Sequence, residues 1–163
     1  MKNVLLPFIV ACLFGCTHRP AMKTGLEGKP IPSFDLLLQD SATHLNTGLI
    51  PAGEPVVFFY FSPYCPYCRA QMQNLIANIK DLQGIRFILV TAFPYSDMKA
   101  FYKHYDLARY SNITIGEDYK QAFGDYFRTS QVPYLAVYDK QRKLKQVNLG
   151  KLYSNEIKDI AFQ

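Results

Sequence analysis

Cysteine is scarce in this chain, which has only four among its 163 residues: Cys12, Cys16, Cys65 and Cys68. So small a number leaves little room for a framework of structural disulfides. Charged residues are also few, at 19% of the sequence, whereas hydrophobic residues make up 49%. The sequence contains no internal repeats and no low-complexity tracts. These values fit one compact globular domain with a sizeable core, together with an additional segment.

A stripe of basic residues is also missing. The formal net charge is +5 at pH 7, but lysines and arginines are spread along the chain. The one dense cluster falls where we expect a hairpin turn and contains Lys140, Arg142, Lys143 and Lys145. We therefore interpret the positive charge as an aid to solubility and expect no nucleic-acid partner.

No apolar run is long enough to cross a bilayer as a permanent helix. The run from Val4 to Phe14 has the length of the hydrophobic part of an export signal. Leu13-Phe14-Gly15-Cys16 resembles the bacterial lipobox, which implies cleavage before Cys16 and lipid on that cysteine. We therefore predict a lipoprotein signal peptide at 1–15, a lipidated tether at 16–27 and the folded domain at 28–163. The alternative is an ordinary export signal with Cys16 incidental, and it also predicts export.

On this assignment Cys65 and Cys68 are the only thiols left in an oxidising compartment, because Cys12 leaves with the signal. They form a C-x-x-C motif between an apolar run at 56–61 and apolar residues at helical spacing up to Leu82. The apolar run suits a central buried strand, and Gly84 supplies a helix stop. A further strand is predicted at 85–92, so that strand, helix and strand form a parallel crossover.

The rest of the sequence continues this α/β pattern. Residues 28–36 open with X-Pro steps and suit an edge strand or the start of a hairpin. Helices are expected at 96–105, begun by Ser96 or Asp97, at 118–127 and from about Ser154. A short strand is expected at 112–115, and two longer strands at 134–138 and 144–149 enclose a turn at 139–143.

Three features together resemble the thioredoxin-fold proteins of the membrane-anchored TlpA/ResA type, in the redoxin superfamily. They are the Pro32-x-Phe34 opening, the Phe61-x-x-Tyr64-Cys65-Pro66-Tyr67-Cys68 run, and Val132-Pro133 before a strand. The resemblance covers 28–163 and implies a three-layer α/β fold, with a central mixed sheet flanked by helices and an N-terminal β-hairpin extension. It also implies a cis-Pro133 that places Val132 beside the cysteines, where its backbone would pair with a substrate strand.

Position in the motif assigns roles to the two cysteines. Cys65 at the helix N-terminus would receive the first free amides and the positive end of the helix dipole, which stabilise a thiolate. It is therefore the expected nucleophile, whereas Cys68, one turn in and more buried, should keep a higher pKa and act as the resolving thiol. Arg69 is either a tuner of the nearby thiolate or a solvated surface residue. Aromatic side chains flank the motif, namely Tyr64, Tyr67 and Tyr134, besides Phe61. Some of them should line an apolar shelf for unfolded or loosely folded protein segments, and Tyr64, Tyr67 and Tyr134 are the predicted substrate-binding residues.

Two residues depart from the family. Phe59 stands where thioredoxins keep a buried acid, and Gln71 stands where several ResA-type proteins carry a glutamate. No neighbouring carboxylate is therefore assigned as the base for Cys68. The Pro66-Tyr67 dipeptide matches that of the glutaredoxins, whose potential of about −200 to −230 mV is more oxidising than that of thioredoxin. The direction of electron flow stays open.

The leading hypothesis is a membrane-anchored thiol–disulfide oxidoreductase that faces the periplasm of a bacterial cell envelope. It would reduce disulfides in exported proteins, including apocytochrome c, without a cofactor, and a membrane electron donor would re-reduce it. A disulfide oxidase or isomerase is the alternative within the same chemistry.

Two other classes of protein use the same fold. A thiol peroxidase is suggested by Ser62 three residues before Cys65, but Phe58 replaces the proline expected upstream. A copper chaperone would need a histidine, and only His104, on an expected solvated helix face, is available. We expect no metal site.

Overall fold

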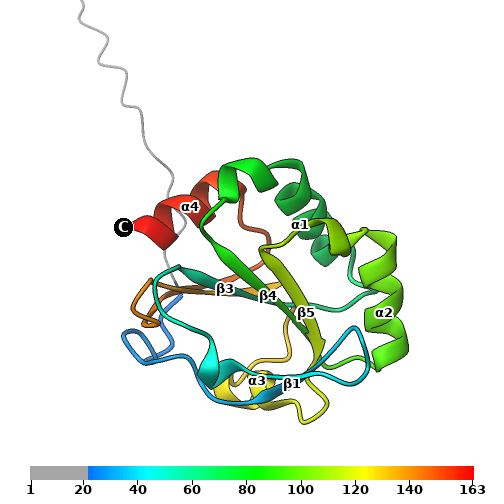
Figure 1. Cartoon of the computed structure of the whole chain (residues 1–163). Coiled ribbons are helices and arrows are strands. Elements are labelled where there is room, and N and C mark those ends of the chain that lie inside the picture. The colour runs from blue at the N-terminus through cyan, green and yellow to red at the C-terminus, as the bar shows by residue number, and fades with distance from the viewer. Residues whose placement is uncertain (1–21) are drawn as a thin grey trace, which may run out of the picture.

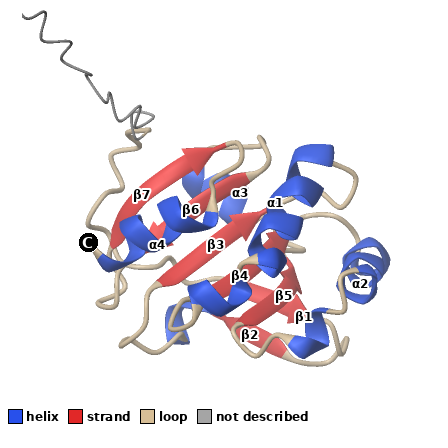
Figure 2. Ribbon diagram, turned by 90° about the horizontal axis from the view of Figure 1, so that it is seen from above, coloured by secondary structure: helices blue, strands red, loops and turns tan. Residues whose placement is uncertain are grey.

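The computed structural model describes residues 22–163 (Figure 1). Their strands form one seven-stranded mixed sheet. The strand order is β2-β1-β5-β4-β3-β6-β7, and Figure 2 shows these strands side by side from β7 at one edge to β2 at the other. The strands are β1 (Asp35–Leu38), β2 (His44–Asn46), β3 (Val56–Tyr60), β4 (Arg86–Thr91), β5 (Ile113–Glu117), β6 (Tyr134–Tyr138) and β7 (Leu144–Leu149).

The central strand β3 is buried along its whole length. Successive side chains of a strand point to opposite faces, so Val57 and Phe59 enter one apolar core and Val56, Phe58 and Tyr60 enter another. This is why the run reads as continuously apolar and not as alternating. The sheet is therefore the middle of three layers.

Helices cover both faces of the sheet. The first core contains buried residues of α1 (Pro66–Ala77), α2 (Tyr95–His104) and α4 (Ser154–Phe162). The second core is closed by the short helix α3 (Ala122–Phe127), which lies on the other side of the sheet from α1 and α4 (Figure 1). The α/β fold predicted from the sequence is confirmed.

Pairing of the strands matches the predicted connections. Strands β3 and β4 are parallel and are joined through α1, which is the expected crossover. Strands β1 and β2 form an antiparallel hairpin, and β1 pairs antiparallel with β5. The N-terminal hairpin extension is thus part of the central sheet.

The segment before the hairpin runs along the outer edge of β7. Met22 bridges Val147, and the N–H of Gly28 donates to the carbonyl of Leu144 at 2.8 Å. Residues 22–27, which we predicted as the end of a tether, are therefore attached to the domain, because β7 offers unpaired backbone groups at the sheet edge. The predicted signal peptide, Cys16 and the first part of the tether lie outside the described residues. Within residues 22–163 no helix has both the length and the apolar character needed to span a bilayer.

Three predicted helix boundaries were wrong. Helix α1 ends at Ala77, where Asn78 takes the C-cap, and a separate 3-10 turn at Ile79–Leu82 continues toward Gly84. Helix α2 begins after Pro94, without a side-chain cap from Ser96 or Asp97. Helix α3 begins only at Ala122, because the Asp118 carboxylate lies ahead of it and accepts hydrogen bonds from its first amides.

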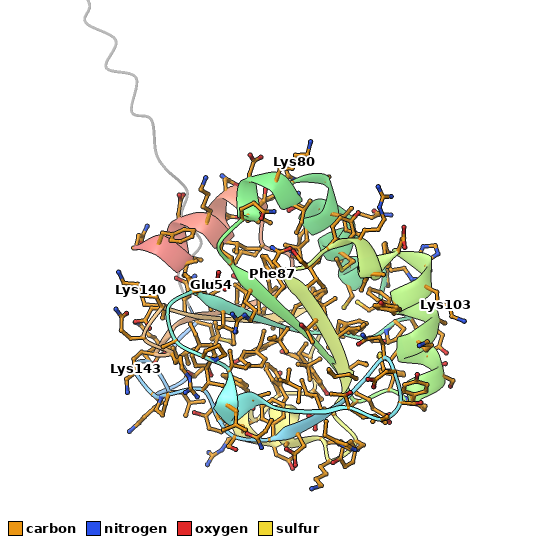
Figure 3. The ribbon with its side chains drawn as sticks, in the orientation of Figure 1. Glu54, Lys80, Phe87, Lys103, Lys140 and Lys143 are labelled. Atoms are coloured by element: carbon orange, nitrogen blue, oxygen red, sulfur yellow. The ribbon has the colours of Figure 1, made fainter. Side chains whose placement is uncertain are left out.

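The turn predicted at 139–143 is confirmed, and it holds the basic cluster except Lys145, which lies in β7. The Asp139 carboxylate organises it by accepting from the N–H of Lys143 at 2.8 Å. Lys140 and Lys143 are exposed and lie on the side of the molecule opposite to Lys103 of α2 (Figure 3).

Candidate active site

The N-terminus of α1 holds the first cysteine of the C-x-x-C motif. Cys65 is the N-cap and Pro66 is the first helical residue, where its missing N–H costs nothing. The Cys65 sulfur accepts a hydrogen bond from the N–H of Cys68 at 3.4 Å. The predicted position of Cys65 at a helix N-terminus is confirmed.

The two cysteines differ in exposure. Both are free thiols, but Cys65 is partly exposed, whereas Cys68 is buried in the first core. Burial raises the pKa of the Cys68 thiol far above its usual range. A partner disulfide can therefore reach Cys65 and not Cys68, which agrees with the predicted division into nucleophile and resolving thiol.

The Val132-Pro133 peptide bond is cis and lies directly beside Cys65. The Cys65 sulfur is 3.9 Å from the carbonyl oxygen of Val132. Among the described residues, none accepts a hydrogen bond from the N–H of Val132. The free N–H of Val132, together with its carbonyl, which accepts only the long hydrogen bond from the Cys65 thiol, is a pair of backbone groups with which an extended peptide could pair.

Only part of the predicted aromatic shelf is present. Tyr64 and Tyr67 are 61% and 69% exposed on either side of Cys65, and Phe93 lies 5.6 Å from the Tyr64 ring. Tyr134 is buried, with 1% exposed, and the prediction that it lines the shelf is wrong. It lies opposite Tyr60 in β3, so its side chain enters the second core, on the sheet face away from the cysteines. Phe61 is likewise buried.

Phe59 and Gln71 stand where related proteins carry an acidic residue, and their surroundings in the structure show whether another carboxylate takes that place. Phe59 is buried against Phe61, with ring centroids 5.5 Å apart. Gln71 is buried on α1 and bonds to the backbone of Leu152. Asp118 is the one fully buried carboxylate in the described part of the chain, and both its oxygens are used at the start of α3, in the second core. Among residues 22–163, no fully buried carboxylate therefore lies in the core that holds Cys68.

Arg69 has a role that the sequence did not indicate. Its Nε donates to the carbonyl of Pro63 at 3.0 Å, so it holds the loop that leads into Cys65. Ser62 belongs to the same loop, is buried, and accepts through Oγ from the N–H of Tyr64 at 3.2 Å. Ser62 thus stabilises a turn, and nothing in its contacts favours a peroxidase.

His104 does not join the cysteines. It is exposed at the end of α2, and its ring stacks edge-on against Tyr105 at 4.7 Å. In residues 22–163 no three histidine, cysteine or acidic side chains gather closely enough to hold a metal ion. The copper-chaperone alternative therefore gains no support.

A cavity of about 190 Å³ adjoins the active-site loop, and sequence reasoning missed it. Tyr64 and Arg69 form one side, and α2 forms the other. From α2 and its end come Asp97, Ala100, Phe101, His104 and Tyr105. The signal available in the sequence was that these α2 residues recur at spacings of three and four, and so share one helix face.

Comparison with known proteins gives a family for this chain. The Redoxin family model matches residues 26–161. The thiol:disulfide interchange protein DsbE of Escherichia coli (strain K12) is 34% identical over 68 residues, which are 41% of this chain and 36% of that protein. The chain thus matches about a third of the length of this curated relative.

Solved structures agree on the fold. A putative thioredoxin from Neisseria meningitidis has a TM-score of 0.63 and 19% identity, and the match covers 79% of this chain and 85% of that one. The exposed lipoprotein thioredoxin Etrx1 of Streptococcus pneumoniae also has a TM-score of 0.63 and 19% identity, with 78% of this chain and 96% of that one covered. This chain is similar to both in its thioredoxin-like architecture.

Proposed function

This chain belongs to the redoxin family, and from that membership and the geometry at Cys65 we propose that it is a thiol–disulfide oxidoreductase that reduces disulfides in exported proteins. The observation that carries the proposal is the placement of Cys65. Its sulfur is accessible at the N-terminus of α1, Cys68 is buried one turn later, and the Val132 carbonyl is 3.9 Å away. The name of the Escherichia coli relative, a thiol:disulfide interchange protein, supports the same chemistry.

The reaction takes place in two exchanges. The Cys65 thiolate attacks one sulfur of the client disulfide, so that a Cys65–client disulfide forms and the other client sulfur leaves as a thiolate. Cys68 then loses its proton and attacks the Cys65 sulfur, which releases the second client thiol. Two electrons pass to the client, and the Cys65–Cys68 disulfide remains to be reduced by an electron donor.

The client would dock as an extended segment. Its backbone would pair with the free N–H and the carbonyl of Val132, and its side chains would contact Tyr64 and Tyr67. Because the contact is mainly through backbone, this mode accepts many sequences. It suits a protein that acts on unfolded or loosely folded exported chains.

The direction of electron flow is tested by the reduction potential. We expect the full chain, equilibrated with glutathione buffers, to give about −200 to −230 mV or lower. A value above about −150 mV would be that of an oxidant, and it would replace the reductase by the disulfide oxidase or isomerase alternative. Alkylation with a mass tag followed by electrophoresis measures the oxidised fraction.

The client and the order of attack are tested by trapping. Cys68→Ser should accumulate mixed disulfides with exported proteins through Cys65, because the resolving step is removed. Cys65→Ser should accumulate none. If insulin disulfides are still reduced catalytically by Cys68→Ala, the resolving role proposed for Cys68 is wrong.

The proposed location is the bacterial cell envelope, with a lipid on Cys16 holding the domain on the periplasmic side of a membrane. A membrane electron donor would then regenerate the dithiol. Cys16→Ala should abolish incorporation of labelled fatty acid into the protein while leaving insulin reduction by the purified protein unchanged. Fatty-acid label on the Cys16→Ala protein would argue against a lipid anchor at this residue.

A further inference from the structure

The cavity beside the active-site loop is positioned to contact a bound client. Tyr64, which directly precedes Cys65, and Pro63 form its near wall, and Phe101 of α2 lies at its base. Its volume of about 190 Å³ suits one side chain. Because a strand rises by about 3.3 Å per residue, a side chain entering it would belong to a residue within about three positions of the client cysteine.

One side of this cavity has an unpaired positive charge. Arg69 uses its Nε to hold the carbonyl of Pro63, which fixes the guanidinium in place. The described residues form two ion pairs, Arg86–Glu54 and Arg109–Asp106, so the Arg69 guanidinium has no carboxylate partner among them. Tyr105 lies close by: burial raises the pKa of its phenol, and the Arg69 charge opposes that rise.

The cavity lining also contains one carboxylate, that of Asp97. Its interaction with the Tyr64 hydroxyl raises the pKa of the Tyr64 phenol. Nearby lysines do not alter the balance at the cavity. Lys99 donates to the carbonyl of Gln39 and lies over Tyr95, and Lys103 points outward from α2 (Figure 3). Asp97 and His104 share the lining with Arg69, and Arg69 is the lining residue that offers a positive charge without an ion-pair partner among the described residues.

The base of the cavity is apolar. Phe101 is buried, and its ring centroid is 4.6 Å from that of Tyr105. An occupant with a short apolar stem and a terminal carboxylate would contact these rings and reach the guanidinium, with which carboxylates form strong charge-assisted hydrogen bonds. Glutamate and aspartate are the side chains with this combination.

We propose that this cavity is a specificity subsite for an acidic side chain of the client, close in sequence to the client's disulfide cysteine. The inference rests on the proposed thiol–disulfide exchange at Cys65 and names a substrate class for it. Cys65 and Val132 would bind the cysteine and the backbone, whereas Arg69 would select the neighbouring side chain. A lysine-bearing client would lose the ion pair and meet like charge.

The test uses peptide disulfides that differ only in having Glu, Gln or Lys two or three residues from the cysteine. For the full chain, purified in detergent, we expect kcat/KM to be about twofold to fivefold higher for Glu than for Gln, as for an ion pair with an exposed arginine. The preference should shrink at high salt. Equal rates for the three peptides, or a preference for Lys, would overturn the subsite.

Variants connect the preference to the cavity. Arg69→Gln should bring the Glu/Gln ratio close to one, and Asp97→Asn should increase it. Ala100 lines the cavity and is exposed, so Ala100→Leu should fill the space and abolish the preference. Ser96→Leu, on the same helix but outside the cavity, is the matched control and should keep the wild-type ratio. An unchanged ratio in both Arg69→Gln and Ala100→Leu would contradict the proposal.

Measuring the binding of unreactive peptides tests the subsite independently of the proposed disulfide exchange. Fluorescent peptides with Ser in place of Cys cannot react, so their anisotropy reports docking alone. Tighter binding of the Glu peptide than of the Gln peptide, lost in Ala100→Leu, would support the subsite. This holds even if the protein reduced none of the peptide disulfides, and that failure would refute the proposed exchange reaction instead. Equal binding of Glu and Gln peptides, together with normal reduction of both, would refute the subsite and leave the exchange reaction intact.

Discussion

The side-chain amide of Gln71 pairs with both backbone groups of Leu152, 81 positions later in the chain. Its Nε2 donates to the Leu152 carbonyl at 2.9 Å, and its Oε1 accepts from the Leu152 N–H at 2.8 Å. Both residues are buried, so water cannot reach their polar groups, and each group finds its hydrogen-bond partner in the other residue. This contact fastens the helix that carries the cysteines to the segment that begins α4.

Gln71→Glu should therefore destabilise the protein. A carboxylate can still accept from the Leu152 N–H, but it cannot donate to the Leu152 carbonyl while ionised, and a buried polar group without a partner costs about 1–3 kcal/mol. Burial also raises the pKa of a carboxyl, so the loss should grow as pH rises and the group ionises. Urea unfolding at several pH values measures this, and Gln73→Glu on the exposed side of α1 is the control. Equal stability of the two variants would argue against the pairing.

Alkylation should distinguish the two thiols of the reduced protein. Iodoacetamide at neutral pH should modify Cys65 first, because Cys65 is partly exposed whereas Cys68 is fully buried with a raised pKa. Mass spectrometry of the digested protein after short exposures gives the two rates, and unfolding in urea should make them similar. Faster labelling of Cys68 in the folded protein would reverse the assigned roles.

Ionisation of Cys68 should also appear in the stability of the reduced protein. The pKa of Cys68 in the folded protein is raised above the ordinary value of 9.0. Above pH 9 the thiol therefore ionises in the unfolded chain but not in the folded one. The contribution of the buried thiol to the free energy of unfolding is complete below pH 9 and is lost as pH rises toward the folded-state pKa. Cys65→Ala keeps only this thiol, and the variant with both cysteines changed to Ala removes it. The difference in unfolding free energy between these variants should fall as pH rises above 9. A constant difference would mean that Cys68 is not shielded from solvent.

Asp118→Ala should weaken the second core through α3. The two Asp118 oxygens accept from the N–H groups of Ala122 and Phe123, at 3.0 and 2.8 Å. Loss of such a cap costs about 1–2 kcal/mol, and Asp118→Asn, which keeps one oxygen, should cost less. Urea unfolding checks the order, with exposed Asp125→Ala on the same helix as the control. Insulin reduction should change little, because α3 lies on the face away from Cys65.

Much of the fold could be predicted from local patterns. Strands β6 and β7 begin and end where the sequence placed them, because each is a short apolar or alternating run bounded by a turn. The placement of Cys65 followed from one strand, one helix and a proline at its first turn. These features depend on neighbours in the sequence, so the sequence contained the information.

The errors arose where distant residues decide the outcome. Tyr134 was predicted to be one of the aromatic residues around the motif, but the pairing of β6 with β3 decides which face of the sheet its side chain enters. The role of Gln71 depends on Leu152, and the attachment of Met22 depends on Val147, and neither partner is close in sequence. The cavity beside Arg69 likewise needs α1 and α2 to lie together.

The segment at 22–30 covers an edge of the sheet that could otherwise pair with the same edge of another molecule. Strand β7 is six residues long and ends the sheet, and an uncovered edge of this kind can polymerise by pairing with the same edge of another molecule. Met22 and Pro30 occupy that edge through their bridges to Val147 and Lys143. Trimming the protein to residue 28, where the sequence pattern suggests that the fold begins, would uncover part of the edge. We therefore expect the segment at 22–30 to hinder aggregation as well as to connect the domain to the preceding chain.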